Sequence, residues 1–372
     1  MSRIAVVCAY PAGENPGMLS VDLAFGSLAK GLPAGTQVSY FCAEDAFELK
    51  AGNNSLKYTL LERREQLLAH DRIVYWGDFL HWIGYFENDF KARVSRRQPV
   101  MDPQALRNAW YDLFLMEGAS EAELSKVVVF GGTLYGLHAG QLAEPRYRQA
   151  LSRLYRHAGL VLMRDQVSAD YVAQLAERSS HPFGCDCAML LDGRSLQSDA
   201  TQSVPPVPYL VCSFGRSGAA RAQLGLVAEI AQRRGLKVVN IDWLGQPRGL
   251  AALANKLALI RGAQLVVTDV YHMAVSSWRE GVPVLGIGRG ASQVHGTLSD
   301  KKKEIFFRQI FASRFYVFIE DVLAAYASNA AMSSFLDRVL QPLDNPQELA
   351  FVREVLQRQQ DRARGSLLKA LA

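Results

Sequence analysis

An arginine, an aspartate and a serine follow the apolar run at residues 160–163. This segment is a candidate anion-binding site. The order Arg164, Asp165, Ser168 predicts a buried strand that ends in an arginine, with a helix that opens near the serine. An arginine in that position offers a planar set of N–H donors to a carboxylate or phosphate, and the helix N-terminus adds amide donors. The structural alternative is an ion pair between Arg164 and Asp165.

Asp269 and His272 follow another apolar run, residues 264–268, and a helix is expected from His272 onwards. Imidazole has an ordinary pKa of about 6.5, which suits proton transfer near neutral pH. A lone histidine more often has a structural role. The place of His272 at a strand end favours the functional interpretation.

Arg289 lies between two glycines after the apolar run at residues 283–287, and the loop that follows leads to Lys301–Lys303. Glycine lets the backbone approach a ligand closely. The lysines would form a positively charged rim for a phosphorylated or carboxylated ligand. For at least two of the three lysines, the favoured alternative is a solvated basic face at the start of a helix.

The glycine-rich turn at residues 13–17 follows the expected first strand, residues 4–8. A loop of this kind before a helix can present backbone amides to phosphate or sugar. Its spacing is not G-x-G-x-x-G, so the dinucleotide-binding motif is absent. The Gly131-Gly132 pair after residues 127–130 is another candidate cleft wall. For the aromatic residues of this half we favour core packing over stacking on sugar: Trp76, Trp82, Tyr85, Phe86 and Trp110.

The composition is that of a folded chain, with 372 residues, 49% hydrophobic content and a formal net charge of +5. It excludes extended disorder and a small disulfide-stapled scaffold, and it gives no reason to expect nucleic acid as a partner. Cys185-x-Cys187 lacks a second ligand pair at zinc spacing, so we expect reduced thiols and no metal. No secretory leader and no apolar run of about 18 residues is found, which favours a cytoplasmic protein. G-x-S-x-G, Walker A and zincin motifs are absent, which weakens hydrolase, NTPase and metalloprotease interpretations.

Short apolar runs alternate with amphipathic stretches, which predicts parallel sheets covered by helices on both faces. In the first half, strands are expected at 4–8, 38–41, 72–76, 127–130 and 160–163, and helices at 56–69, 145–157 and within 82–115. After the proline-rich stretch 193–208, strands are expected at 209–213, 236–242, 264–268 and 283–287, and helices at 219–234, 249–261 and 272–280.

The predicted fold class is α/β, with two Rossmann-like doubly wound domains facing a cleft. Residues 1–195 form the first domain, 196–208 a linker and 209–344 the second domain. Residues 345–372 form a C-terminal helix that would cross back to the first domain. Ligands are expected in the cleft, near the carboxyl ends of the strands.

Taken in order, the motifs resemble those of the polysaccharide pyruvyl transferase family, from about residue 1 to 320. The resemblance rests on four segments: the loop Gly13–Gly17, the strand ending in Arg164-Asp165-x-x-Ser168, the Asp186-x-Ala188-x-x-Leu191 segment, and the block with Asp269, His272, Gly281 and Pro283. Members have a GT-B-like fold. The resemblance implies transfer of the carboxyvinyl unit of phosphoenolpyruvate onto a sugar as a ketal, with release of phosphate and without a cofactor or metal.

The resemblance also implies roles for individual residues. His272 would move a proton, and Asp269 would orient the histidine or accept a sugar hydroxyl. Arg164, together with Arg289 or Lys303, would clamp the anionic donor.

On the acceptor side, Asn15, Gly17 and Asp78 would contact a sugar of a bacterial-type polysaccharide or of its lipid-linked precursor. The basic C-terminal helix leaves peripheral membrane association open, although we favour a helix packed on the protein.

One departure from the family concerns the positions that usually read Arg-Leu-His, which here are Val270, Tyr271 and His272. Either Arg289 or one of Lys301–Lys303 supplies the missing positive charge, or the chain uses another donor or acceptor, or it has no catalytic activity. The alternatives are therefore a GT-B glycosyltransferase that uses a nucleotide sugar, and a non-catalytic glycan-binding relative.

Overall fold

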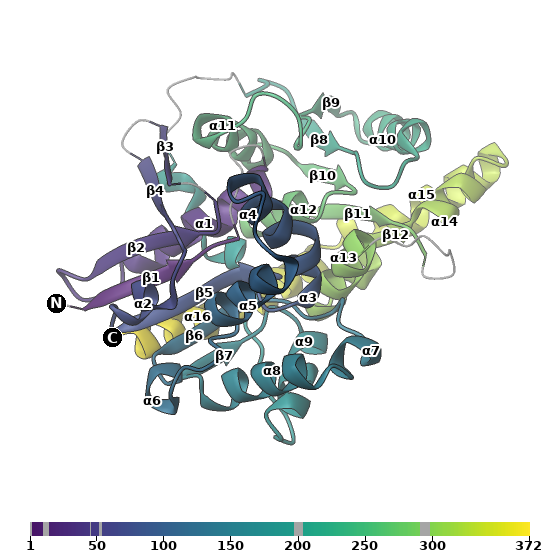
Figure 1. Ribbon diagram of the computed structural model, residues 1–372. Helices are drawn as coiled ribbons and strands as arrows, with labels where there is room; N and C mark the ends of the chain where they lie inside the picture. Colours follow the sequence, from purple (N-terminus) through teal and green to yellow (C-terminus); the bar gives the residue numbers. More distant parts are fainter. Residues whose placement is uncertain (1, 10–14, 45, 52–53, 197–203, 291–297) are drawn as a thin grey trace.

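The computed structural model describes residues 2–9, 15–44, 46–51, 54–196, 204–290 and 298–372. They form two α/β domains, each built on a largely parallel sheet (Figure 1). Three expected features lie partly outside the described residues: the linker 196–208, the turn at 13–17 and the loop between Arg289 and Lys301.

The first domain contains a seven-stranded sheet in the order β3-β4-β2-β1-β5-β6-β7, in which only the β3–β4 pair is antiparallel. Without β3, this is the doubly wound order whose direction of progression reverses between β1 and β5. The strands are β1 (Arg3–Val7), β2 (Gln37–Cys42), β3 (Phe47–Ala51), β4 (Asn54–Leu60), β5 (Arg72–Asp78), β6 (Val127–Gly132) and β7 (Leu160–Leu162).

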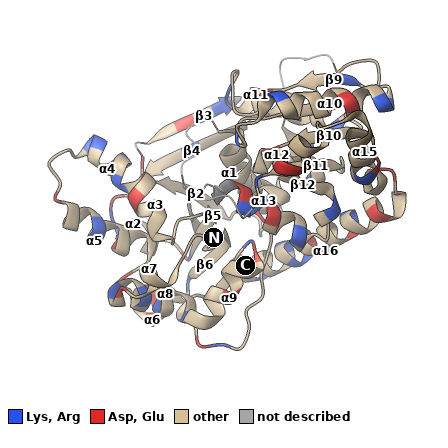
Figure 2. Ribbon diagram, turned by 90° about the vertical axis from the view of Figure 1, so that its right-hand side faces the viewer, with Lys and Arg blue, Asp and Glu red and all other residues tan. Residues whose placement is uncertain are grey.

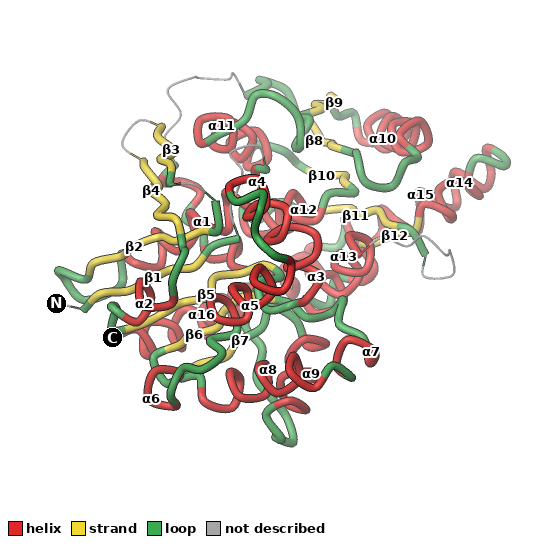
Figure 3. The backbone as a smooth tube through the Cα atoms, viewed as in Figure 1, coloured by secondary structure: helices red, strands yellow, loops and turns green. Residues whose placement is uncertain are grey.

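Helices cover both faces of this sheet (Figure 3). They are α1 (Pro16–Ala29), α2 (Arg64–Leu68), α3 (Ile83–Tyr85), the π-helix η1 (Phe86–Phe90), α4 (Lys91–Arg97), α5 (Pro103–Phe114), α6 (Glu121–Leu124), α7 (Ala139–Leu142), α8 (Pro145–His157) and α9 (Gln166–Leu175). The 3₁₀ turns η2 (Cys187–Leu190) and η3 (Gly193–Ser195) follow. The predicted helix at 145–157 is confirmed.

The predicted helix at 56–69 is wrong, because its first half is strand β4 and only Arg64–Leu68 is helical. Alternate side chains of β4, Leu56 and Tyr58, are buried against the core. Tyr58 stacks on Phe47 of β3, with ring centroids 4.5 Å apart. Cross-strand packing of β-branched and aromatic side chains outweighs the helical spacing of the apolar residues here.

The second domain has a five-stranded, all-parallel sheet in the order β12-β11-β10-β8-β9, which reverses between β8 and β10. Its strands are β8 (Tyr209–Ser213), β9 (Lys237–Asn240), β10 (Leu265–Thr268), β11 (Val284–Gly288) and β12 (Tyr316–Phe318). Its helices are α10 (Ala220–Arg234), α11 (Leu250–Arg261), α12 (Tyr271–Arg279), α13 (Leu298–Gln309), α14 (Ile319–Ala325) and α15 (Asn329–Leu343), with the 3₁₀ turn η4 (Ser313–Phe315). The predicted fold class, with two doubly wound domains, is confirmed.

The last helix, α16 (Pro346–Leu371), starts beside α15 and ends beside the first sheet (Figure 1). The Nε atom of Arg72, at the start of β5, donates to the Ala370 carbonyl at 2.9 Å. Acidic and basic residues are interspersed along α16 (Figure 2), and Arg358 forms an ion pair with Glu354 one turn earlier. Among the described residues, no helix is long and apolar enough to cross a membrane.

Candidate functional site

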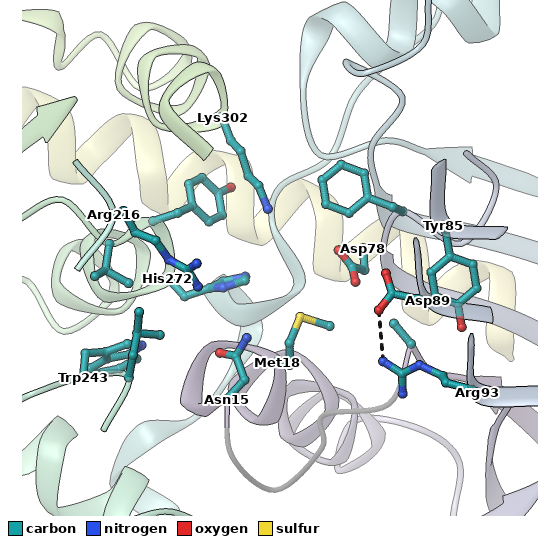
Figure 4. Close-up of a pocket in the computed structure, with 15 residues that line it drawn as sticks. Asn15, Met18, Asp78, Tyr85, Asp89, Arg93, Arg216, Trp243, His272 and Lys302 are labelled. Carbon is teal, nitrogen blue, oxygen red and sulfur yellow. Dashed lines mark hydrogen bonds and ion pairs between the residues drawn. The ribbon is translucent and has the colours of Figure 1, made fainter. Parts of the chain in front are cut away.

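A pocket of about 310 Å³ lies between the two domains, where the carboxyl ends of their strands meet. Its walls include residues that follow β1 and β5 in the first domain and residues that follow β8 and β10 in the second (Figure 4). Both points of strand-order reversal therefore border the same space, which is where doubly wound folds bind ligands. The volume is in the range of small-molecule sites.

His272 lies in the first turn of α12 and lines the pocket. Its Nε2 atom is buried and lies 3.9 Å from the Oδ2 atom of Asp186. The pKa of His272 is lowered to about 4, mainly by burial. The nearby cations, first among them Lys302, also lower this pKa, whereas Asp186 raises it. The ring is therefore neutral at pH 7 in the empty pocket.

Asn15 and Gly17 bring the start of α1 against this histidine. Asn15 caps the helix by accepting the Gly17 amide on Oδ1 at 3.0 Å, and its side chain lines the pocket. A Cβ atom on Gly17 would lie 2.3 Å from the Nδ1 atom of His272. Glycine is therefore needed here for the close approach of helix and ring.

Lys302 is the lysine of the Lys301–Lys303 run that lines the pocket. Its Nζ atom lies 4.6 Å from the ring centroid of Phe79 and 5.6 Å from that of Tyr271. Burial and, after it, the charge of the Arg164 guanidinium lower the pKa of Lys302 to about 8. The ammonium is thus held between two aromatic rings and shares its surroundings with another cation.

Lys303 and Arg289, both predicted to bind the donor, instead brace the loops behind the pocket, and neither lines it. The Nζ atom of Lys303 is buried and donates to the carbonyls of Asp269 and Ile287 at 2.7 and 2.8 Å. Arg289 donates from Nε to the Ser217 carbonyl at 2.8 Å. Neighbouring helical positions point about 100° apart, so Lys302 faces the pocket and Lys303 faces the sheet.

Asp269 is fully buried and also has a bracing role. Its carboxylate accepts the backbone amides of residues 215–217 at 2.7 to 3.0 Å and the Ser217 hydroxyl at 2.8 Å. These bonds fix the loop after β8, whose Arg216 side chain lines the pocket. In this arrangement Asp186, rather than Asp269, is the carboxylate closest to His272.

Arg164 lies behind Tyr271 and lines a second, smaller cavity of about 20 Å³, with room for a water molecule. Its Nη1 atom donates to Oδ2 of Asp186 at 3.3 Å, while its buried Nη2 atom has no partner among the described residues. Its guanidinium packs 5.1 Å from the ring centroid of Tyr271. Lys302 borders both cavities, so an anion beside Lys302 would also feel the charge of Arg164.

The first domain supplies the opposite wall, and Figure 4 shows its carboxylates on the side away from Lys302 and Arg216. Asp78 ends β5 and points into the pocket. Asp89, on η1, also lines the pocket, as does Arg93, with which it pairs at 3.2 Å. The two walls therefore differ in charge.

Four residues of the site were not singled out from the sequence for the roles seen here. Lys302 was one of three equivalent lysines, and Arg216 follows a strand end as Arg164 does. Asp89 lies in an aromatic and charged stretch without a strand end to mark it. Asp186 was part of a family motif only, and it lies outside any regular element. In the described part of the chain, no three metal-ligating side chains come together.

Comparison with known protein families finds one whose model matches just under half of the chain. The model of the polysaccharide pyruvyl transferase family matches residues 108–290, which contain Arg164, Asp186 and His272. This match confirms the resemblance seen in the sequence motifs. No curated protein matches the chain.

Solved structures resemble the whole chain. A protein assigned as a UDP-N-acetylglucosamine 2-epimerase from Listeria monocytogenes has 13% sequence identity and a TM-score of 0.52, and the match covers 99% of this chain and 95% of that one. A UDP-GlcNAc 2-epimerase from Neisseria meningitidis, bound to UDP-GlcNAc, has 10% identity and a TM-score of 0.49, with 100% and 99% coverage. The first likeness concerns the fold alone and supports the GT-B-like arrangement.

Proposed function

We propose that this chain, whose residues 108–290 match the polysaccharide pyruvyl transferase family, transfers the carboxyvinyl unit of phosphoenolpyruvate onto a sugar as a ketal and releases phosphate. The observation that carries the proposal is the division of the pocket into two unlike walls. Lys302, Arg216 and His272 come from the second domain. The carboxylates of Asp78 and Asp89 come from the first, together with Arg93, which pairs with Asp89. A trianionic donor suits the cationic wall, and a hydroxyl-rich sugar suits the acidic one.

The cationic wall would hold the phosphate and carboxylate of the donor. The Lys302 ammonium is partly removed from water between Phe79 and Tyr271, which strengthens its attraction to an anion. Arg216 reaches the same space from a loop that Asp269 fixes. Val270 lines the pocket where the family usually has arginine, so we assign the missing positive charge to Lys302 rather than to Arg289 or Lys303.

His272 would deliver the proton to the methylene carbon, C3, of the donor. Lys302 and Arg216 lower the pKa of His272 in the empty pocket, and a bound anion would neutralise them. Donor binding therefore raises the pKa of the imidazole and favours its protonated form. Asp186, at 3.9 Å, would stabilise the imidazolium.

The bond changes balance as follows. One sugar hydroxyl adds to C2 of phosphoenolpyruvate as C3 takes a proton, and a second hydroxyl of the same sugar replaces the phosphate on C2. Of the two hydroxyl protons, one ends on C3 and the other on the released phosphate. The products are the ketal and hydrogen phosphate, with no redox change and no co-reactant.

The acceptor would lie against the first domain, near Asn15, Asp78 and Asp89. Its class is a sugar of a polysaccharide or of the lipid-linked precursor. Because phosphoenolpyruvate is a cytoplasmic metabolite, we place the reaction in the cytoplasm or at the inner face of the membrane.

The test is release of phosphate from phosphoenolpyruvate by the full chain in the presence of a panel of lipid-linked oligosaccharides. His272→Ala should reduce the rate by about 10²- to 10⁴-fold, the usual range for loss of a general acid. His157→Ala, at the end of α8 and outside the pocket, is the matched control and should keep the wild-type rate. Retained turnover in His272→Ala would remove this residue from the mechanism.

Thermal-shift measurements separate the proposal from its alternatives. Stabilisation by phosphoenolpyruvate supports the pyruvyl transferase. Stabilisation by a UDP-, GDP- or CMP-sugar alone would indicate a nucleotide-sugar glycosyltransferase. Stabilisation by neither class, together with no phosphate release, would indicate a non-catalytic glycan-binding protein.

A further inference from the structure

The end of β5 has an unusual backbone conformation beside the pocket. Gly77 and Asp78 both have positive φ angles, +74° and +51°. Glycine adopts this region freely, but an aspartate there carries strain on the order of 1 kcal/mol or more. The turn is held by the Asp78 carbonyl, which accepts the Thr133 amide at 2.9 Å. Strained residues of this kind concentrate at functional sites.

The side chain of Asp78 is half-buried and lines the pocket. No hydrogen bond or ion pair from another described residue reaches its carboxylate, whereas the neighbouring Asp89 pairs with Arg93 at 3.2 Å. In Figure 4 the Asp78 carboxylate points into the space between the two walls. Its surroundings thus leave its oxygens available to a ligand.

The charge around Asp78 suits a base. Burial raises the pKa of Asp78, while the cations Lys302 and Arg164 lower it and the carboxylates Asp89 and Asp186 raise it. The side chain is therefore a stronger base than an exposed aspartate. Lys302 and Arg164 still favour the ionised form.

We propose that Asp78 is the catalytic base that takes the proton from the attacking sugar hydroxyl. The inference deepens the proposed function and rests on it, because it assigns the reacting hydroxyl to the first-domain wall. Asp78 and His272 line the same pocket from opposite domains. The acceptor would approach from the side of Asp78 and the donor from the side of Lys302.

The proton steps follow from this placement. The hydroxyl oxygen forms its bond to C2 of the donor as its O–H bond breaks, and the proton passes to an Asp78 oxygen. The π electron pair of C2=C3 takes a proton from the imidazolium of His272. The C2–O bond to phosphate then breaks with its electron pair leaving on phosphate. The second hydroxyl bonds to C2 and returns its proton to His272, while Asp78 passes its proton to the departing phosphate.

The variant to make is Asp78→Gly, because glycine removes the carboxylate and also relaxes the positive φ angle. We expect phosphate release to fall by about 10²- to 10⁴-fold, while the Kd for phosphoenolpyruvate changes by less than about threefold. Added sodium formate should raise the rate of phosphate release by the variant at least tenfold, because formate acts as an external carboxylate base. The matched control is Asp71→Asn, which lies directly before the first residue of β5 and outside the pocket. This variant should keep the wild-type rate.

The pH profile gives a second readout that a structural role would not move. The acidic limb of kcat/KM should disappear in Asp78→Gly. The groups that face Asp78 and could shift this limb are Lys302 of α13, Arg164 after β7, Asp89 of η1 and Asp186 before η2. They remain in the variant, so a limb that persists unchanged would overturn the assignment.

Failure of this inference is distinguishable from failure of the proposed function. If the wild-type chain releases no phosphate from phosphoenolpyruvate with any acceptor, the proposed function fails. If the wild type is active and Asp78→Gly keeps more than a third of its rate, Asp78 is not the base. Loss of phosphoenolpyruvate binding in the variant would likewise overturn the assignment and give Asp78 a donor-binding role.

Discussion

The Nε2 atom of His272 lies 3.9 Å from the Oδ2 atom of Asp186, across the junction of the two domains. The same oxygen accepts hydrogen bonds from the Tyr271 hydroxyl at 3.0 Å and from Arg164 at 3.3 Å. Burial alone would raise the pKa of Asp186, but the neighbouring His272 and Arg164 hold it below its ordinary value. One ionised carboxylate of the first domain therefore fixes the start of α12 in the second.

The first prediction concerns Asp186→Asn. Removing this negative charge should lower the pKa of His272 further below its value of about 4, because Asp186 is the group that raises it. We expect phosphate release to fall by roughly 10- to 100-fold, through loss of the imidazolium partner. The readout is the NMR titration of the His272 ring protons. Tyr271→Phe removes a hydrogen bond to the same oxygen but keeps its charge, so it should shift the histidine pKa less. An unchanged histidine pKa in Asp186→Asn would contradict the assignment.

The second prediction separates two adjacent lysines. Lys302→Ala should raise the KM for phosphoenolpyruvate by roughly 10- to 100-fold, because a partly desolvated charge–anion contact contributes about 1.5 to 3 kcal/mol. Lys301→Ala, an exposed neighbour outside the pocket, is the control and should leave the KM unchanged.

The same lysine predicts a pH dependence of donor binding. Since burial lowers the pKa of Lys302 to about 8, the ammonium loses its proton as the pH rises through 8. Binding of phosphoenolpyruvate should then weaken above pH 8 in the wild type, and this loss should be absent in Lys302→Ala. Isothermal titration calorimetry at pH 7 and pH 9 measures both, and equal affinities in the wild type would exclude Lys302 from the donor site.

Much of the fold could be predicted because its signals are local. The second domain shows apolar runs that are buried on both faces, and α10 ends where Gly235 adopts φ +63°. The stretch 56–69 was mispredicted because its strand depends on Tyr58 packing against Phe47 in a hairpin. That contact depends on both strands, so the pattern of apolar residues in either strand alone does not reveal it.

The site could be predicted only in part, because strand ends locate the cleft but do not say which side chain faces it. The sequence pointed to His272, Asn15 and Asp78, which the structure brings to one pocket. It also pointed to Lys303, which differs from Lys302 by one helical position and hence by about 100° around the axis. The segment with Asp186 has no regular pattern, so its approach to His272 is a consequence of how the two domains meet.

The fourth prediction concerns Gly17→Ala. The new Cβ would lie 2.3 Å from the Nδ1 atom of His272, so the ring must move from its place beside Asp186. Turnover should fall by roughly 10²-fold, since misplacement of a catalytic group by about 1 Å has this effect. Gly26→Ala on the same helix is the control, because its Cβ meets its nearest atom at 3.8 Å. It should keep activity and gain up to about 1 kcal/mol of stability from helix propensity. Equal activity of both variants would show that the ring position is not critical.

The last prediction concerns a buried carboxyl on α1, away from the pocket lining. Burial raises the pKa of Asp22 to about 7, although a hydrogen bond from the Tyr58 hydroxyl at 2.7 Å opposes this. The folded state therefore holds a proton that the unfolded chain releases near pH 4. The contribution of this group to the free energy of unfolding is complete below pH 4 and is lost as the pH rises to about 7. At about 1.4 kcal/mol per unit, the loss is about 4 kcal/mol at most. Asp22→Asn keeps an acceptor for Tyr58 and removes the titration, so urea unfolding should show it more stable than the wild type at pH 8 and nearly equal at pH 4. A stability difference that does not change with pH would show that Asp22 keeps its ordinary pKa in the folded protein.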